Sequence, residues 1–404
     1  MSPSKSDLML SSIAGAAGGV CLAHAISKYK DSSSTVRFIK DSASLFPIHP
    51  DEQEIMVHGF GMMHSEDIID GARCLFIPSH WNFADMELRA LRNLSPRQFD
   101  ESISSVCLLG HDFIACKGSL ARLCKRLMPT EQLNLYLPKS WPVEAWDELH
   151  DLIRRKVISP DALLIVKTNL QRQTSTFVYR AKCLPTSDDL KKEEVVIIQT
   201  LLSNSLCIDG RKVTLRVYVL CYASASSRRM WRFSNGFVYY SKKAYSENSD
   251  DLDSQIASGY GDREVYNTRP LTLHDLWKRL PSAISHRYDH DIDACLTSSI
   301  GTLIKASDVI GDVPRGAFQM FGCDIFLKDY KECCEDDSLA MLLEVNKAPD
   351  LTYKSEKDGV LKRSLIRKMW LLMSRPNLLN ISRSAILKDD IVEKEMEDTW
   401  INLI

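Results

Sequence analysis

Residues 321–326 read FGCDIF, and residues 342–346 read LLEVN. Polar side chains stand isolated among apolar ones in both stretches, with Asp324 in the first and Glu344 and Asn346 in the second. Alternate side chains of a strand share a face, so Glu344 and Asn346 are expected to point the same way. The two stretches therefore predict neighbouring strands that bring these polar groups together.

The chemistry of these polar groups points to a metal ion. Leu343 and Val345 are expected to point into a core, so the acid and the amide beside them would be costly to bury unless something bound them. Carboxylate and amide oxygens suit a hard cation such as Mg²⁺. Asp324, Glu344 and Asn346 are therefore candidate metal ligands; the alternative is a set of polar residues at a solvated sheet edge.

The rest of the chain mixes strand-like and helix-like patterns. Short apolar runs predict strands at residues 163–166, 176–180, 195–199 and 213–222. Helical patterns cover residues 86–94, 119–127, 146–157, 271–279, 291–305 and 358–374. The polar, acidic stretch 246–255 is expected to be an exposed loop. This order favours an α+β or mixed α/β architecture.

The pairing of FGCDIF with LLEVNKAPDL resembles the closing signature of the tubulin tyrosine ligase-like family. The family usually writes it as an FGFD strand, an LLEVN strand and a proline. Its members hold Mg²⁺ against the phosphates of ATP with the acid of the first strand and the Glu and Asn of the second. The resemblance implies an ATP-grasp fold with an N-terminal α/β lobe, the cofactors ATP and Mg²⁺, and the metal ligands Asp324, Glu344 and Asn346.

Other segments resemble the family in the same order along the chain. Residues 210–220 are similar to its G-x-KFD-x-RVYVL strand, in which Lys212 matches the first lysine and Arg216 the arginine that contacts the terminal phosphate. A guanidinium suits a transferring phosphoryl group, so Arg216 is the expected catalytic residue. Lys167 matches a lysine that binds phosphates in the family. The hinge beside adenine is matched by Gln199, Thr200 and Leu201.

Several positions depart from the family pattern. Residues 168–176 contain no glycine where the family has a Gly-rich phosphate loop. Thr214 replaces an acid, Ser234 replaces an arginine, and Ala257 and Ser258 replace a Thr-Asn pair that touches nucleotide. The metal end matches the family, whereas the phosphate loop and part of the nucleotide end are altered.

The resemblance implies ATP-dependent ligation of a free amino acid such as Glu, Gly or Tyr to an acidic protein tail, with tubulin as the expected protein. Two basic strips could bind such a tail. One lies within residues 354–368 (Lys354, Lys357, Lys362, Arg363, Arg367 and Lys368), and the other comprises Arg228, Arg229 and Arg232. Two alternatives stay open: an inactive relative that acts as a binding module, and a ligase for a substrate other than tubulin.

The whole chain of 404 residues has a formal net charge of −2, which gives no reason to expect a nucleic-acid partner. Residues 8–26 lack formal charge and could be a membrane anchor, a cleaved targeting peptide, or a buried or disordered leader. We expect a cytoplasmic protein, with or without a tether at this segment. The expected division is a leader (1–40), an N-terminal lobe (41–155), a central ATP-grasp lobe (156–212), a C-terminal ATP-grasp lobe (213–380) and a tail (381–404).

Overall fold

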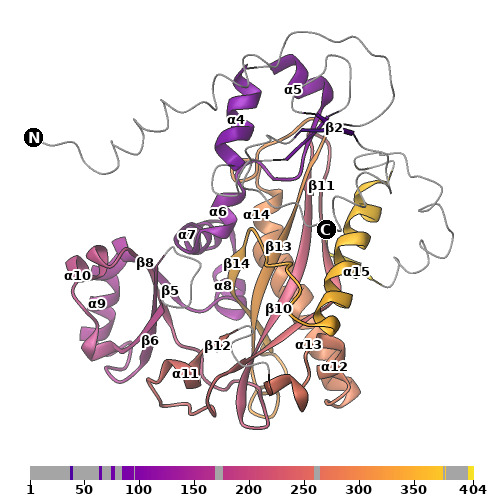
Figure 1. Cartoon of the computed structure of the whole chain (residues 1–404). Helices are drawn as coiled ribbons and strands as arrows, with labels where there is room; N and C mark the ends of the chain where they lie inside the picture. The colour runs from indigo at the N-terminus through magenta and orange to yellow at the C-terminus, as the bar shows by residue number, and fades with distance from the viewer. Residues whose placement is uncertain are drawn as a thin grey trace, which may run out of the picture.

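The computed structural model describes residues 37–39, 63–65, 74–77, 84–94, 96–168, 176–258, 264–375, 378 and 399–404. Two sheets organise these residues, a large one that runs through the centre of the molecule and a small one beside it (Figure 1). The chain is a mixed α/β protein, because parallel strands at one end of the large sheet continue into antiparallel strands at the other.

The large sheet has long antiparallel strands at its centre. Its main path runs β12-β11-β10-β13-β4-β3-β1-β2, and β14, β15 and β9 join it from the side. Its strands are β1 (Arg37–Ile39), β2 (Met63–Ser65), β3 (Cys74–Phe76), β4 (Ile103–Ser105), β9 (Cys207–Ile208), β10 (Arg211–Ala223), β11 (Arg228–Ser241), β12 (Ala257–Ser258), β13 (Ala317–Leu327), β14 (Ala340–Asn346) and β15 (Trp400–Asn402). A single parallel pair, Ala317 with Ser105, connects the antiparallel part to the N-terminal parallel strands.

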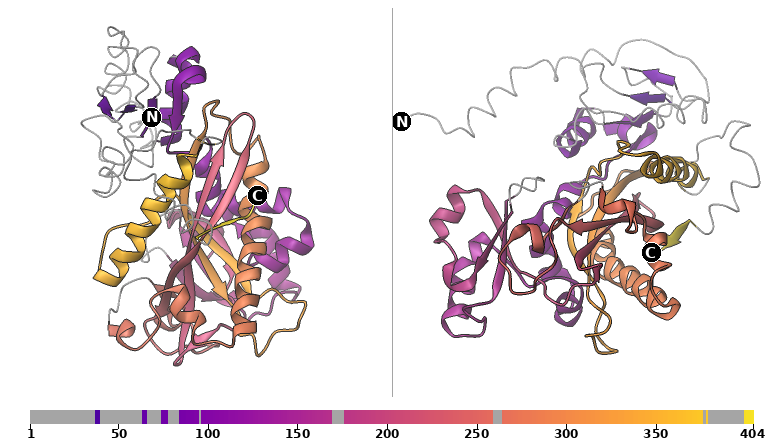
Figure 2. Two further views of the ribbon diagram at one scale, coloured as in Figure 1. Left: turned by 90° about the vertical axis from the view of Figure 1, so that its right-hand side faces the viewer. Right: turned by 60° about the horizontal axis from the view of Figure 1, so that its bottom comes forward.

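Alternation along the central strands explains how both faces of this sheet are covered. On β10, Val217 and Val219 belong to one apolar core, and Tyr218 and Leu220 belong to the other. The first core also holds residues of α13 (Ser282–Leu296) and α14 (Thr302–Lys305), and the second holds residues of α15 (Glu356–Met373). The views in Figure 2 show these helices on opposite sides of the sheet. The site described below lies on the α15 side, further along the same strands.

The small sheet has the order β5-β8-β6-β7. Its strands are β5 (Ser140–Pro142), β6 (Leu163–Thr168), β7 (Thr176–Arg180) and β8 (Val195–Thr200). A separate apolar core, which contains Trp141, Leu149, Leu164 and Ile198, joins it to α9 (Trp146–Arg154) and α10 (Ser187–Lys192). The remaining helices are α4 (Ala84–Leu94), α5 (Pro96–Ser102), α6 (His111–Ala115), α7 (Lys117–Leu127), α8 (Thr130–Tyr136), α11 (Leu252–Gln255) and α12 (Leu273–Trp277).

The structure confirms most of the predicted elements and corrects others. The prediction missed β11, although its 14 residues form one of the central strands. The helix expected from residue 291 begins earlier, at Ser282, and continues through a π-helical turn at Thr297–Gly301. The expected exposed loop 246–255 ends in α11, whose Ser254 and Gln255 are buried.

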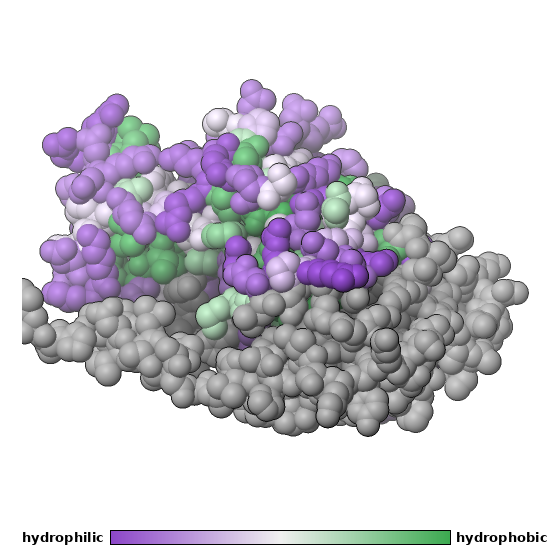
Figure 3. Space-filling view, turned by 90° about the horizontal axis from the view of Figure 1, so that it is seen from above, coloured by the Kyte–Doolittle hydropathy of each residue, from purple (hydrophilic) through white to green (hydrophobic). Residues whose placement is uncertain are grey.

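Other expectations concern the ends of the chain. The segment 8–26 lies outside the described residues, and among the described helices none is long and apolar enough to cross a membrane. Residues 400–402, within the expected tail, form β15 and pair with β11. The division into lobes stays a prediction. Seen from above, the described surface is mostly hydrophilic, with smaller groups of hydrophobic residues between (Figure 3).

Candidate active site

Two neighbouring strands, β13 and β14, supply the predicted metal ligands, and β10 adds the predicted catalytic Arg216 beside them. Asp324 on β13 pairs in register with Arg216 on β10 and with Glu344 on β14. The amide of Asn346 donates to Glu344 across 3.3 Å (Nδ2 to Oε1), which confirms that these two side chains share a face. Arg216 and Asp324, which are 108 positions apart in the sequence, thus meet at one place on the sheet.

A β-bulge changes one expectation at this place. The β13–β14 register shifts after Asp324, so Ile325 pairs with Leu342 and Leu343 is left as the extra residue. Leu343 was expected to point into a core, but it is half-buried and lines the same pocket as Glu344. The prediction for Leu343 was therefore wrong, because strict alternation fails at a bulge.

The two acids differ in how easily they ionise. Burial and the neighbouring Glu344 raise the pKa of Asp324, against the opposing effect of the Arg216 guanidinium. Burial also acts against ionisation of Glu344, but Lys117, Lys167 and Arg216 together hold the pKa of Glu344 below its ordinary value. Two carboxylates and an amide oxygen in a partly buried cluster suit a divalent cation, which would compensate their repulsion.

Arg216 is held in place by Asp324. Its guanidinium donates to both carboxylate oxygens, over 2.5 Å from Nε and 3.1 Å from Nη2, and it lies 5.5 Å from the centre of the Tyr239 ring. Burial alone would lower the pKa of Arg216, yet Asp324 keeps that pKa well above its ordinary value. Gly322 makes room for the side chain, because a Cβ there would lie 3.0 Å from Arg216 Cδ.

Two lysines converge on Glu344 from other elements. Lys117, in the first turn of α7, places Nζ 3.8 Å from Glu344 Oε2. Lys167 on β6 is buried, and burial lowers its pKa while Glu344 opposes that shift. A buried lysine without a full ion pair is costly, so an anionic ligand would be bound favourably between these amines.

The predicted hinge lies at the end of β8. Gln199 is buried, and its Nε2 donates to Ser140 Oγ over 2.9 Å. The backbone amides of Thr200 and Leu201 already donate, to the carbonyls of Lys139 and Leu163. At the far end of β10, Lys212 Nζ donates to the carbonyl of Leu202 over 3.3 Å, and burial lowers the pKa of Lys212 to about 8.

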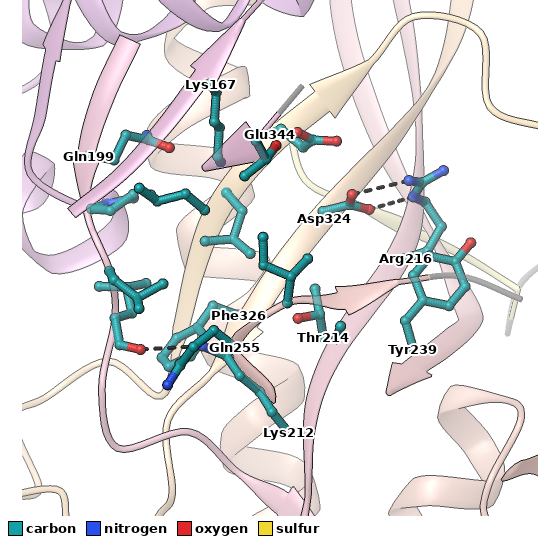
Figure 4. Close-up of a pocket in the computed structure, with 18 of the residues that line it drawn as sticks. Lys167, Gln199, Lys212, Thr214, Arg216, Tyr239, Gln255, Asp324, Phe326 and Glu344 are labelled. Atoms are coloured by element: carbon teal, nitrogen blue, oxygen red, sulfur yellow. Dashed lines mark hydrogen bonds and ion pairs between the residues drawn. The ribbon is translucent and has the colours of Figure 1, made fainter. Parts of the chain in front are cut away.

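One pocket of about 330 Å³ joins all of these groups (Figure 4). The predicted site residues all line it: Lys167, Gln199, Thr200, Leu201, Lys212, Arg216, Asp324, Glu344 and Asn346. Apolar walls come from Ile165, Phe326 and Leu343. Cationic groups, carboxylates and these apolar walls in one pocket fit a nucleoside triphosphate with its metal ion.

Among the lining residues that were not assigned to the site from the sequence are Lys117, Tyr239, Gln255, Asp350 and Lys354. Lys117 had a usable signal, since the helix it begins resembles a family helix, but nothing local indicated that its amine reaches Glu344. Tyr239 lies on the strand that the prediction missed. Residues 169–175, in which the expected phosphate loop lacks glycine, lie outside the described residues.

The structure changes the interpretation of both basic strips. Arg232 is fully buried and bonds to Asp289 and Asp293 of α13, so it cannot bind an external tail. In the other strip Lys362 is also buried and pairs with Asp358 at 3.1 Å. The exposed members that remain on α15 are Lys357, Arg363 and Arg367.

The sequence of this chain is similar to the sequences of one known protein family. The sequence model of the Tubulin-tyrosine ligase family matches residues 137–378, more than half of the chain. The probable tubulin polyglutamylase TTLL9 of Mus musculus is 28% identical over 194 residues, which are 45% of this chain and 39% of that protein. The tubulin polyglutamylase TTLL6 of Homo sapiens is 25% identical over 312 residues, 70% of this chain and 32% of that protein. The matches thus span well under two thirds of these relatives' own length.

A solved structure supports the fold independently. The C-terminal domain of Pby1 from K. lactis, an ATP-grasp enzyme, superposes with a TM-score of 0.58 at 13% identity, covering 92% of this chain and 98% of that domain. The chain therefore has an ATP-grasp fold. Since the family match includes β6, β8, β10, β13 and β14, which carry the predicted metal and nucleotide residues, the chain belongs to the tubulin-tyrosine ligase family.

Proposed function

We propose that this chain is an ATP-dependent ligase that joins the amine of an amino acid to a carboxylate of an acidic protein tail. The observation that carries the proposal is the convergence of Arg216, Lys167 and Lys117 on the acids Asp324 and Glu344 in one pocket. Cations beside oxygen ligands for a metal are what phosphoryl transfer from ATP to a carboxylate needs.

The residues of the chain fit the two steps of such a reaction. In the first, an acceptor carboxylate oxygen attacks the terminal phosphorus of ATP, the bond to the bridging oxygen breaks, and ADP leaves. In the second, the amine attacks the acyl carbon, loses a proton and expels inorganic phosphate, which leaves an amide. Arg216, oriented by Asp324, stabilises negative charge on the transferring phosphoryl group, and Lys167 and Lys117 orient the phosphates.

A magnesium ion held by Asp324, Glu344 and Asn346 would supply charge neutralisation at the phosphates. The donor set supports this assignment, because two carboxylates and one amide oxygen come from adjacent strands and Asn346 is buried. The hydrogen bond that Asn346 Nδ2 donates to Glu344 leaves the side-chain oxygen of Asn346 available as a ligand.

Similarity to the relatives favours tubulin as the protein substrate and glutamate as the amino acid that is added to it. The names of the matched TTLL9 and TTLL6 proteins describe them as tubulin polyglutamylases, the first as a probable one. Acidic tails would require basic groups near the pocket, and Lys354, which lines it, together with the exposed Arg363 and Arg367 of α15, can provide them. The identity of this chain's protein substrate is thus part of the proposal.

A binding module without turnover is the second candidate. Thr214 and Ala257 line the pocket at positions where the family has an acid and a threonine. Loss of polar contacts to the nucleotide would weaken catalysis before it abolished binding. The candidate metal ligands and the cationic side chains proposed to bind the phosphates are still present. This candidate predicts nucleotide binding without amino-acid incorporation.

The test is incorporation of labelled glutamate, glycine or tyrosine by the full chain with Mg·ATP. Tubulin is compared with an unrelated acidic peptide of similar charge. The variant Glu344→Gln removes a metal ligand, and Glu335→Gln, an equal change at an exposed residue, is the matched control. Incorporation into tubulin that Glu344→Gln abolishes and Glu335→Gln retains would support the proposal.

Other results would redirect it. Equal incorporation into tubulin and the unrelated peptide would mean that the substrate is any acidic chain and not tubulin in particular. ATP binding without incorporation of any amino acid would support the binding module. Failure of ATP to bind at all would contradict the proposed ligase function.

A further inference from the structure

The first two turns of α15 contain a fully buried ion pair. Lys362 and Asp358 are 1% and 0% exposed, and Lys362 Nζ lies 3.1 Å from Asp358 Oδ1 and 3.2 Å from Asp358 Oδ2. Burial lowers the pKa of Lys362, and Asp358 opposes that shift. Neither side chain lines the pocket. Because a buried ion pair adds little stability compared with an apolar pair of similar size, its role lies in what else it binds.

The pair bonds to the backbone of the segment that precedes the helix. Lys362 Nζ donates to the carbonyl of Thr352 over 2.7 Å, and Asp358 Oδ2 accepts from the N–H of Lys354 over 2.8 Å. Residues 347–355, which connect β14 to α15, form neither helix nor strand. Their backbone groups therefore need partners outside regular secondary structure. The buried pair supplies one donor and one acceptor, which together set the path of this segment.

Further contacts fold the same segment back onto α15. Ser355 caps the helix, and its Oγ accepts from the N–H of Asp358 over 3.2 Å. The Tyr353 ring lies against the helix beside Gly359, where an added Cβ would come within 3.3 Å of Tyr353 Cγ. The guanidinium of Arg363 lies 5.1 Å from the centre of the same ring. The segment is therefore held by several independent contacts to the first turns of α15.

This segment forms part of the pocket wall. Asp350 and Lys354 both line the pocket, and Lys354 Nζ lies 2.7 Å from Asp350 Oδ2, with 31% of the Lys354 side chain exposed. Pro349 begins the segment next to Gly322, where an added Cβ would lie 3.0 Å from Pro349 Cβ and 3.0 Å from Arg216 Cδ. The segment thus starts beside the proposed catalytic arginine and carries a partly exposed amine to the pocket.

We propose that Lys362 and Asp358 are positioning residues, which hold Lys354 at the pocket wall so that its amine binds a carboxylate of the acidic protein substrate. A lysine on a loose segment would lose backbone and side-chain freedom each time a substrate bound, whereas here the backbone is ordered beforehand. The pair therefore contributes to affinity for the protein substrate and not to ATP binding. The inference rests on the proposed function.

The test replaces the ion pair by an apolar pair in the full chain. Lys362→Met with Asp358→Leu leaves no buried charge without a partner, so the melting temperature should stay within roughly 4 °C of wild type. Hydrogen exchange measured by mass spectrometry should become faster in residues 350–355, which lose two bonds to α15. Exchange in β13 and β14 should not change, because the effect is local.

Steady-state kinetics separate positioning from a purely structural role. In this double variant the KM for a glutamate-rich acceptor peptide should rise roughly 3- to 10-fold, and kcat and the KM for ATP should stay within about twofold of wild type. Fluorescence anisotropy with the labelled peptide measures the same loss of affinity without turnover. A purely structural role would instead lower the melting temperature and speed exchange in β13 and β14 as well.

Two further double variants serve as controls. Lys362→Met with Asp358→Asn keeps an acceptor for the backbone N–H at position 354, so its loss of peptide affinity should be smaller. Arg287→Met with Asp291→Leu also removes one positive and one negative charge. Arg287 ties down another segment by donating to carbonyls within residues 334–337, and neither residue of this pair lines the pocket. Peptide affinity should therefore stay at the wild-type value.

Each opposite result has a distinct meaning. Unchanged exchange in residues 350–355 of Lys362→Met with Asp358→Leu would overturn the positioning role. Faster exchange there with unchanged peptide affinity, or an equal loss of affinity in the Arg287 and Asp291 control, would overturn its link to the substrate. The proposed function fails differently, because wild type would then bind no ATP or incorporate no amino acid. Exchange and anisotropy would still decide the role of the pair.

Discussion

Arg216 and Asp324 lie opposite each other on β10 and β13 and form a two-pronged ion pair, with Nε to Oδ1 at 2.5 Å and Nη2 to Oδ2 at 3.1 Å. The pair is mostly shielded from solvent, with 14% and 15% of the two side chains exposed. Asp324 thus has two functions in the proposed site: it orients the guanidinium and offers oxygen to a metal ion. Each function depends on a neighbouring strand, because Arg216 lies on β10 and Glu344, the next candidate metal ligand, lies on β14.

The first prediction concerns this pair. Arg216→Met should lower the free energy of unfolding by roughly 3 kcal/mol, because Asp324 is left in a low-dielectric site without its partner. The double variant Arg216→Met with Asp324→Leu should recover most of that loss, since an apolar pair replaces an uncompensated charge. Urea unfolding of the two variants checks this. Additive losses would mean that the two side chains are not coupled.

The second prediction tests the metal ligands through stability. Mg·ATP at about 100 times its dissociation constant should raise the free energy of unfolding by roughly 2.7 kcal/mol in wild type. Glu344→Gln should lose this gain, since one anionic ligand is missing from the cation site. Thermal melts with and without Mg·ATP measure it, and Glu335→Gln should behave like wild type. An unchanged gain in Glu344→Gln would refute the metal assignment.

The third prediction concerns pH. Burial lowers the pKa of Lys212 from 10.5 to about 8, so the folded protein releases this proton before the unfolded chain does. The unfolded state then binds more protons between pH 8 and 10.5, and this residue makes the free energy of unfolding rise with pH by up to about 1.4 kcal/mol per unit there. Below pH 8 the contribution does not change with pH.

Nucleotide affinity should follow the opposite trend. In the proposed site the charged amine of Lys212 donates to the nucleotide, so ATP should bind more weakly as pH rises through about 8. Calorimetric titrations at pH 7, 8 and 9 measure this, and Lys212→Met should flatten the profile. Lys243→Met, at an exposed lysine outside the pocket, is the matched control. A pH profile that is the same in wild type and in Lys212→Met would contradict the prediction.

The fourth prediction tests the basic strip on α15. Arg363→Glu with Arg367→Glu, at exposed positions on α15, should weaken binding of an acidic tail peptide, and the weakening should shrink at high salt. Arg154→Glu with Arg155→Glu, at the C-terminal end of α9 and outside the pocket lining, makes the same charge change and should have no effect. Fluorescence anisotropy with a labelled peptide compares them. Equal loss in both double variants would indicate a general charge effect.

The fifth prediction concerns Arg232, which the sequence suggested as part of a surface strip. Arg232→Met should lower the free energy of unfolding by roughly 3–5 kcal/mol, because Asp289 and Asp293 lose their buried partner. Binding of the acidic peptide by the folded fraction should not change. Chemical denaturation and anisotropy are the two measurements. Weaker peptide binding at unchanged stability would restore the surface interpretation.

Local pattern predicted much of the fold. The apolar runs that became β6, β7, β8, β10, β13 and β14 were identified within a few residues of their observed bounds. The motifs placed Lys167, Arg216, Glu344 and Asn346 in one site, and all of them line the pocket. β11 was missed because its polar residues, among them Arg232 and Asn235, interrupt the apolar pattern. Arg232 is paired with Asp289 and Asp293 of α13, and Asn235 Oδ1 accepts from the backbone N–H of His274 as well as from that of the neighbouring Gly236.

What the sequence determined by itself is the set of strands and the chemistry carried on each one, because periodicity and isolated polar residues are local properties of the chain. The tertiary structure alone decided which charges meet. It pairs Arg216 with Asp324, brings Lys117 from α7 to Glu344, buries Arg232 against α13 and turns Gln255 from an expected loop into a pocket wall. The physical reason is that burial and electrostatic pairing depend on distances between segments remote in sequence, and strand register and a single bulge set those distances.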